Sequence, residues 1–195
     1  MTWVIFDFAG VIGQHQPQES LDGMVKIAGA PDPEAFWAAY WRHRESYDAG
    51  AVTADGYWAA VLGAVPEAAT VARLVEADVA SWLFPDVDTV ELIGELADRG
   101  TGLALYSNCP LELAEALDRL PWLDPIRNRF YSSRLGQVKP DPAAFRTVAG
   151  LLGVEPEDCA FVDDRPANVA GAEAAGMTGF VFTDAATLRR NLAAR

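Results

Sequence analysis

The chain has 195 residues, of which 51% are hydrophobic and 22% are charged, a balance typical of a folded protein with a hydrophobic core. Asp and Glu outnumber Lys and Arg by 28 to 15, which gives a formal net charge of −13 at pH 7. This charge repels nucleic-acid backbones and anionic lipid surfaces, so neither is an expected partner. An anionic substrate therefore needs a local positive group.

The apolar segment Trp3–Phe6 has no basic residue before it and is interrupted by Asp7, so it does not resemble a secretory signal. No apolar run approaches the roughly 20 residues needed to cross a bilayer. The two cysteines, Cys109 and Cys159, form neither a disulfide framework nor a CxxC metal motif. We therefore expect a cytoplasmic protein.

Short apolar runs that end in polar residues and precede helical patterns recur along the chain, which is typical of buried parallel strands. These runs are Trp3–Phe6, Gly102–Tyr106, Arg129–Tyr131, Ala160–Val162 and Gly179–Phe182. Helical spacing follows in the intervening segments, at Val87, Val90, Ile93 and Leu96 before Gly100, and at Leu113, Leu117 and Leu120. Asp141 followed by Pro142 is typical of a further helix N-terminus. The alternation predicts an α/β fold with a doubly wound, mostly parallel, Rossmann-like sheet.

Residues 14–84 break this alternation, because they carry helical patterns without a convincing strand. Thr53 is placed to cap a helix there. Several aromatic residues at helical spacing are expected to form the insert's own core: Phe36, Trp37, Tyr40, Trp41 and Trp58. His15, Arg42, His43 and Arg44 are expected at the surface. We predict a helical cap domain at residues 14–84, inserted into a core domain formed by residues 1–13 and 85–195.

Polar side chains lie where the predicted strands end. They are Asp7 after the first strand, Ser107 and Asn108 after the second, Lys139 in the loop after the third, and Asp163 and Asp164 after the fourth. Because the carboxyl ends of parallel strands meet at one edge of a sheet, we expect these side chains to converge.

Three neighbouring carboxylates need a counter-charge, since like charges raise each other's pKa. Mg²⁺ prefers oxygen ligands and leaves coordination positions for water and a phosphate oxygen. Lys139 and the Ser107 hydroxyl are suited to hold the remaining phosphate oxygens. A carboxylate that faces the phosphorus atom is suited to attack it as a nucleophile.

These strand-end motifs resemble the four motifs of the haloacid dehalogenase superfamily, in order and over nearly the whole chain. They read Val4-Ile5-Phe6-Asp7-Phe8-Ala9-Gly10-Val11-Ile12, then Tyr106-Ser107-Asn108, then Gly136-Gln137-Val138-Lys139-Pro140-Asp141-Pro142, then Phe161-Val162-Asp163-Asp164 with Asn168. The insert is similar to the helical cap of one branch of that superfamily. The resemblance implies catalysis by Asp7, Ser107 and Lys139, substrate binding by Ser107, Asn108 and Lys139, and metal ligation by Asp7, Ala9, Asp163 and Asp164.

Position 9 departs from the family pattern, because family phosphatases usually carry there a second Asp that protonates the leaving group. Ala9 keeps the backbone carbonyl that serves as a metal ligand, but it has no acid. Members similar to sugar-1-phosphate phosphatases have Gly at this position, and dehalogenases also lack the Asp.

The expected function is a Mg²⁺-dependent phosphatase that acts on a small phosphorylated metabolite, such as a sugar phosphate or sugar 1-phosphate, through an aspartyl-phosphate at Asp7. One alternative is a metal-free 2-haloacid dehalogenase in which Asp7 attacks carbon. The other is a regulatory binding protein that lost catalysis together with the acid at position 9.

Overall fold

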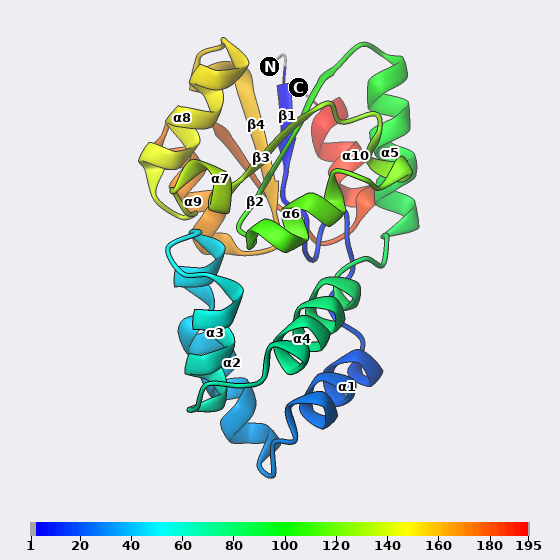
Figure 1. Ribbon diagram of the computed structural model, residues 1–195. Helices are drawn as coiled ribbons and strands as arrows, with labels where there is room; N and C mark the ends of the chain where they lie inside the picture. Colours follow the sequence, from blue (N-terminus) through cyan, green and yellow to red (C-terminus); the bar gives the residue numbers. More distant parts are fainter. Residues whose placement is uncertain (1–2, 195) are drawn as a thin grey trace.

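The computed structural model describes residues 3–194 and contains one sheet of parallel strands with helices on both faces (Figure 1). The strands are β1 (Trp3–Phe6), β2 (Gly102–Ser107), β3 (Asn128–Tyr131), β4 (Cys159–Asp163) and β5 (Thr178–Val181). Their order is β3-β2-β1-β4-β5, so β1 is central and pairs with β2 and β4. The predicted α/β fold with a doubly wound parallel sheet is confirmed.

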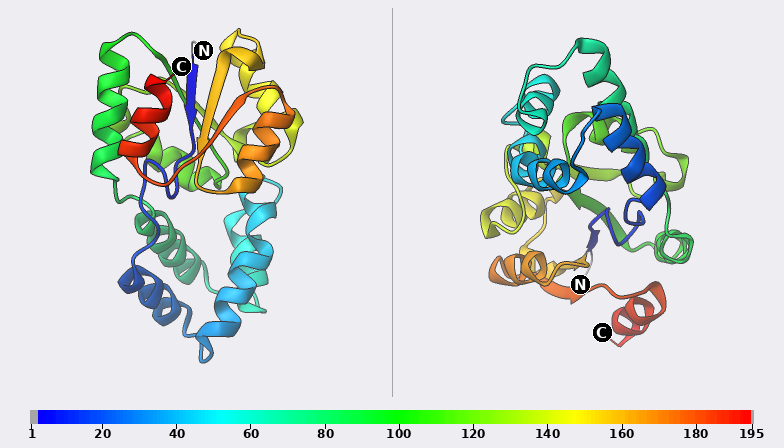
Figure 2. Two further views of the ribbon diagram at one scale, coloured as in Figure 1. Left: turned by 180° about the vertical axis from the view of Figure 1, so that it is seen from behind. Right: turned by 90° about the horizontal axis from the view of Figure 1, so that it is seen from below.

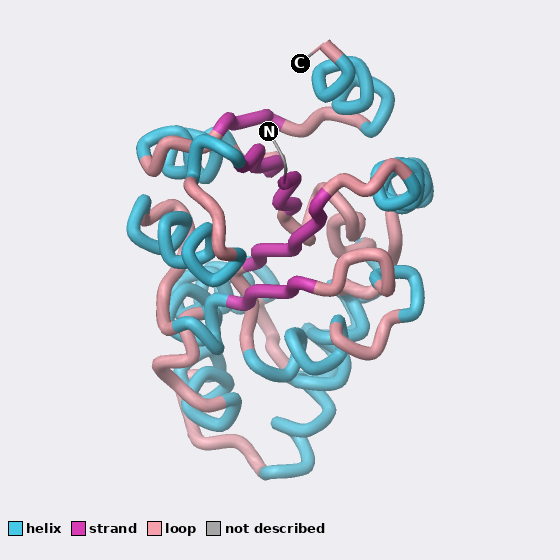
Figure 3. Tube along the Cα trace, turned by 90° about the horizontal axis from the view of Figure 1, so that it is seen from above, coloured by secondary structure: helices cyan, strands magenta, loops and turns pink. Residues whose placement is uncertain are grey.

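Helices cover the two faces of the sheet because side chains alternate between the faces along each strand. Val4 and Phe6 pack with α5 (Val87–Asp98), α6 (Leu111–Leu117) and α10 (Ala185–Ala193), whereas Ile5 packs with α8 (Pro142–Leu152) and α9 (Pro166–Ala174). Figure 3 shows these helices on opposite sides of the strands. A short helix, α7 (Ser132–Leu135), follows β3, and 3-10 turns lie at Pro121–Leu123 and Pro156–Asp158. Within residues 3–194, no helix combines the length and apolar character that crossing a bilayer requires.

The helix boundaries follow local signals in two instructive places. Asp141 accepts a hydrogen bond from the Ala143 amide at 2.9 Å and caps α8, as its position before Pro142 predicted. The helix expected through Leu120 ends at Leu117 instead. Leu120 is extended because it precedes Pro121, whose ring disfavours helical backbone in the residue before it.

The segment between β1 and α5 forms four helices: α1 (Gln18–Ala28), α2 (Pro33–Asp48), α3 (Ala54–Leu62) and α4 (Ala68–Ser81). They share a hydrophobic cluster that includes Met24, Tyr40, Trp58 and Leu74. Thr53 caps α3 by accepting a hydrogen bond from the Gly56 amide. No strand occurs in this segment, which lies wholly within the described part of the chain. The division of the chain into a cap domain and a core domain stays a prediction.

One of the expected core aromatics is exposed. Phe36, Tyr40 and Trp58 are buried in the cluster, but Trp41 is 55% exposed. The reason is helical geometry, since neighbouring residues on a helix point about 100° apart and α2 turns Tyr40 and Arg44 inward.

The four helices lie beyond the carboxyl ends of the strands (Figure 1 and Figure 2), and the contacts that join them to the core include the two connections and the end of α2. At the connections, the Gln14 amide donates to Phe84 O at 2.7 Å, and the Asp86 amide donates to Ile12 O at 2.8 Å. At the end of α2, Ser132 Oγ donates to the backbone oxygen of Asp48 at 2.5 Å. The insert is thereby held over the edge of the sheet where β1, β2 and β4 end.

Candidate active site

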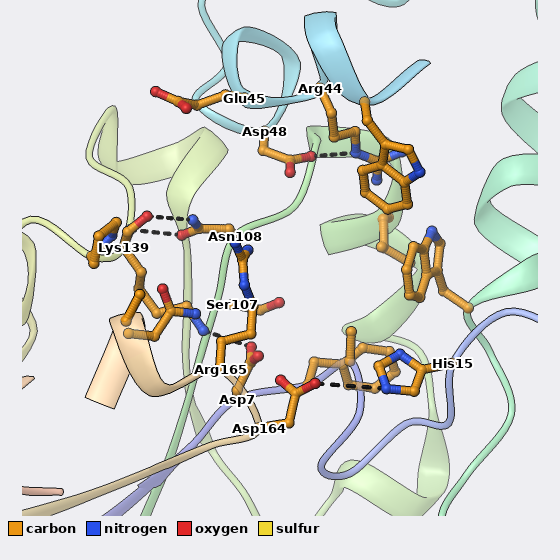
Figure 4. A pocket seen from close by; sticks show the side chains of 18 residues that line it. Asp7, His15, Arg44, Glu45, Asp48, Ser107, Asn108, Lys139, Asp164 and Arg165 are labelled. Carbon is orange, nitrogen blue, oxygen red and sulfur yellow. Dashed lines mark hydrogen bonds and ion pairs between the residues drawn. The ribbon is translucent and has the colours of Figure 1, made fainter. Parts of the chain in front are cut away.

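A cavity of about 580 Å³ lies between the strand ends and the insert (Figure 4). Core residues that line it include Asp7, Ala9, Ser107, Asn108, Lys139 and Asp164. Helix α2 contributes Trp41, Arg44, Glu45 and Asp48 from the opposite side. The structure therefore brings nearly all of the predicted site residues to one cavity, with Asp163 buried directly behind it.

Asp7 follows the last residue of β1 and is 6% exposed. Its amide donates to Val162 O at 2.8 Å, which extends the pairing with β4 and fixes the backbone. Burial raises the pKa of the Asp7 carboxyl to about 7 because it disfavours the charged form. The charge of Lys139 lowers this pKa and the charge of Asp163 raises it, so the two neighbours act on the pKa of Asp7 in opposite directions.

Lys139 bridges two carboxylates. Its Nζ lies 2.7 Å from Asp7 Oδ1 and 2.8 Å from Asp163 Oδ2, and its side chain is almost completely buried. Burial alone lowers the pKa of a lysine, but attraction to the two carboxylates outweighs this effect and raises the pKa of Lys139. The lysine therefore stays charged and partly compensates the acidic site.

Asp163 is fully buried, and three residues donate hydrogen bonds to its carboxylate. Asn168 Nδ2 lies 2.9 and 3.1 Å from its two oxygens, and the Arg165 amide donates to Oδ1 at 2.8 Å. These contacts, together with Lys139, fix the orientation of the carboxylate.

Asp7, Asp163 and Asp164 each offer a carboxylate oxygen, and these atoms all lie within 4.8 Å of one another. Oxygen-only ligands at this spacing suit Mg²⁺, which binds through few protein carboxylates and keeps water positions. Gly10 makes room for Asp164, because a Cβ at position 10 would lie 2.7 Å from Asp164 Oδ2. Gly10 also has a φ angle of +75°, a backbone conformation that residues with a side chain rarely adopt. The residues present therefore fit a divalent cation.

Asn108 holds the lysine loop. Its Oδ1 accepts from the Lys139 amide and its Nδ2 donates to Lys139 O, both at 2.9 Å, although Asn108 also lines the cavity. On the other side of the loop, a Cβ on Gly171 of α9 would lie 2.1 Å from Pro140 O. Asn108 thus fixes the backbone of Lys139 and Gly171 packs closely against the next residue of the loop, while direct contact of Asn108 with substrate stays a prediction.

Arg44 is 5% exposed, so the expectation that it lies at the surface is wrong. Its Nε donates to Asp48 Oδ1 at 2.7 Å, and its Nη1 donates to Asp78 Oδ2 at 2.9 Å and to the hydroxyl of Tyr40. Burial raises the pKa of Asp48 to about 6, against the lowering effect of Arg44. The four-residue spacing from Arg44 to Asp48 was a sequence signal for an ion pair, but Asp78 lies 34 residues away.

Two further residues, His15 and Asp164, lie together at the edge of the cavity. His15 lines the cavity with its Nε2 3.6 Å from Asp164 Oδ2, although its side chain is largely exposed. Asp164 does not cap α9, because Arg165 occupies the N-cap position and no side chain accepts there. Arg165 and Trp41 also line the cavity, and no motif in the sequence pointed to either of them.

Comparison with known proteins identifies the class to which this fold and site belong. A family model described as haloacid dehalogenase-like hydrolase matches residues 1–176. The chain therefore belongs to the haloacid dehalogenase-like hydrolase family. A phosphoglycolate phosphatase from Rhodospirillum rubrum is 33% identical over 192 residues, which cover 92% of this chain and 78% of that protein.

Other similarities are partial or concern the fold alone. Flavin mononucleotide hydrolase 1 from Arabidopsis thaliana is 38% identical over 102 residues, or 52% of this chain, but the match spans only 42% of that protein. A Bacteroides thetaiotaomicron enzyme of the same family, solved with magnesium and inorganic phosphate, superposes with a TM-score of 0.77 at 16% identity and covers 96% of this chain and 98% of that chain. L-2-haloacid dehalogenase from Xanthobacter autotrophicus superposes with a TM-score of 0.71 at 21% identity, covering 100% and 83%.

Proposed function

We propose that the protein is a Mg²⁺-dependent phosphatase that hydrolyses a small phosphorylated metabolite through an aspartyl-phosphate at Asp7. The observation that carries the proposal is the cluster of Asp7, Asp163 and Asp164, two of which contact Lys139, at the floor of a cavity large enough for a small molecule. The phosphatases among the relatives support a phosphate ester as the substrate.

In this mechanism an oxygen of Asp7 attacks the phosphorus atom, and the bond from phosphorus to the leaving oxygen breaks. Lys139 and the Ser107 hydroxyl donate to phosphate oxygens, while Asp163 holds the lysine in place. Water then attacks the acyl phosphate, which releases phosphate and restores the Asp7 carboxylate. Asp7, Asp163, Asp164 and the Ala9 carbonyl would hold Mg²⁺, whose positive charge would offset the charges of the phosphate and the carboxylates.

Ala9 bears on the choice of substrate. General acid catalysis is typically worth about 10²- to 10⁴-fold in rate, and Ala9 has no proton to give. We therefore propose a substrate whose leaving group departs readily, such as an anomeric or acyl phosphate. A sugar phosphate, and a sugar 1-phosphate in particular, is the preferred natural class.

The proposal extends to the organisation of the chain. We propose that residues 14–84 form a cap domain over a core of residues 1–13 and 85–195. The insert's separate hydrophobic cluster and the hydrogen-bonded connections at residues 12–14 and 84–86 support this division. A cytoplasmic location and a small-molecule substrate, without nucleic-acid or membrane partners, belong to the same proposal.

The test measures phosphate release from acetyl phosphate, a sugar 1-phosphate and a simple alkyl phosphate, each with Mg²⁺ and with a chelator. We expect Mg²⁺-dependent turnover of the first two substrates and little turnover of the third. Asp7→Asn should abolish turnover, whereas Asp98→Asn at an exposed position should not. Ala9→Asp should improve the alkyl ester selectively. Equal rates for all three phosphates in the natural protein would show that another residue donates the proton.

The same assay, extended to halide release from a small 2-haloacid, separates two rival functions. A dehalogenase releases halide from a small 2-haloacid without metal, with Asp7 attacking carbon, and the superposition on a dehalogenase concerns the fold alone. A regulatory binding protein shows no turnover of any substrate under any metal condition. The acidic cluster around Asp7 favours the phosphatase, because attack on carbon does not need three carboxylates together.

A further inference from the structure

The side of the cavity formed by α2 takes no part in the chemistry at Asp7. It presents Trp41, an aromatic side chain that is 55% exposed yet lines the cavity, and Asp48, whose side chain is only 14% exposed. Arg165 lines the same cavity from the core side, across from α2 (Figure 4). Among residues 3–194, the structure records no hydrogen bond or ion pair of the Arg165 guanidinium.

Asp48 is held as an oriented acceptor. Arg44 Nε donates to Asp48 Oδ1, and no described residue donates to Oδ2. Arg44 is held in turn by Asp78 and Tyr40, so it is not free to bind a ligand. One guanidinium between two carboxylates leaves this buried group with a net negative charge. The insert thus offers the cavity a fixed negative acceptor, while the core offers Arg165 as an exposed cationic donor.

We propose that Trp41, Asp48 and Arg165 form the binding site for the leaving group, and that they select an uncharged, hydroxyl-bearing ring. This inference rests on the proposed phosphatase function and names the substrate class for it. Hydroxyl groups on such a ring donate to Asp48 and accept from Arg165, and the apolar face of the ring lies against Trp41.

Other leaving groups are disfavoured by charge and solvation. An apolar group would cover Asp48 and Arg165 without replacing their hydrogen bonds to water, which is costly for charged groups. A carboxylate or second phosphate would face the negative group around Asp48, and a cation would face Arg165. An uncharged group that both donates and accepts hydrogen bonds satisfies both charged side chains at once.

The test compares four phosphates with the natural protein and Mg²⁺. Acetyl phosphate is too small to span the cavity and reports on the chemistry at Asp7 alone. Glucuronic acid 1-phosphate differs from glucose 1-phosphate only at C6, where a carboxylate replaces the hydroxymethyl group. Trifluoroethyl phosphate has a leaving group of similar acidity to an anomeric hydroxyl but lacks the ring hydroxyls. We expect kcat/KM for glucose 1-phosphate to exceed that for glucuronic acid 1-phosphate and for trifluoroethyl phosphate, each by about tenfold or more.

Variants then locate the binding site. Trp41→Ala and Asp48→Asn should each lower the ratio of kcat/KM for glucose 1-phosphate to that for acetyl phosphate by about tenfold, as expected for losing one good contact. Asn keeps an oxygen for Arg44 but turns a donor toward the cavity. Trp41→Phe should retain most of the ratio, and Glu34→Gln, an exposed change at the far end of α2, should leave it unchanged.

The outcomes distinguish this inference from the function on which it rests. No hydrolysis of acetyl phosphate would refute the phosphatase function and the inference together. Hydrolysis of acetyl phosphate with an unchanged ratio in Trp41→Ala and Asp48→Asn would overturn the inference alone. Equal or better turnover of glucuronic acid 1-phosphate or trifluoroethyl phosphate would overturn it as well, because the argument from charge or the argument from solvation would then be wrong.

Discussion

Asp7→Asn should make the metal-free protein more stable at and above neutral pH. The pKa of Asp7 is raised by burial from 3.8 to about 7, so the folded protein holds a proton that the unfolded chain has already lost. Between about pH 4 and pH 7 the folded state therefore binds more protons, and the free energy of unfolding falls as pH rises. Asn is uncharged and keeps an oxygen that accepts from Lys139, so the variant lacks this loss.

The magnitude follows from the size of the shift. About three pKa units correspond to about 4 kcal/mol, since one unit is worth about 1.4 kcal/mol. Above pH 7 the variant should approach this gain in the free energy of unfolding, and below pH 4 the two proteins should be equally stable.

Urea unfolding with a chelator present, from pH 4 to pH 8.5, measures the difference directly. Asp98→Asn serves as the control because it removes an exposed carboxylate. If Asp7→Asn and the natural protein keep a constant stability difference across this range, the argument from burial of the carboxylate is refuted. Adding Mg²⁺ should stabilise the natural protein more than Asp7→Asn, which lacks one charged ligand.

Three other changes test neighbouring parts of the site. Lys139→Met should abolish phosphatase activity and lower the free energy of unfolding at pH 8 by about 3–5 kcal/mol, because two buried carboxylates lose their shared cation; stability equal to that of the natural protein would contradict this. Arg44→Leu should destabilise by a similar amount, about 3–5 kcal/mol in urea unfolding, since it leaves two partner carboxylates buried without a counter-charge; a loss under about 1 kcal/mol would count against a tight ion pair. Asp164→Asn should weaken Mg²⁺ binding measured by calorimetry without lowering stability in chelator, because burial and Asp163 already raise the pKa of this carboxyl; unchanged affinity would remove Asp164 from the metal site.

The parts of the molecule that the sequence predicted are those encoded locally. An apolar run followed by Asp7 indicates a buried strand with a polar end, and the topology of a parallel sheet then places all strand ends together. The carboxylates and Lys139 converge for this reason.

The wall formed by α2 could not be predicted in the same way. Arg44 is buried only because Asp78, on another helix, lies opposite it, and no local pattern encodes that pairing. Trp41 is a large aromatic residue of the kind usually found in a core, and its exposure depends on which face α2 turns toward the other helices. Asn108 resembles a ligand in sequence, yet its amide is used on the backbone of Lys139, a contact formed only when the two loops meet.

The contact between Gly171 and the carbonyl of Pro140 limits how this enzyme can be engineered. Replacing helical glycines with alanine is a common route to thermostability, and Gly171, in the middle of α9, is an obvious target for it. A methyl group at this position would meet the Pro140 oxygen and push the neighbouring lysine loop away from the sheet. A library screened only for heat resistance would therefore tend to recover proteins whose reactive centre has been displaced, so position 171 should be held fixed in any such design.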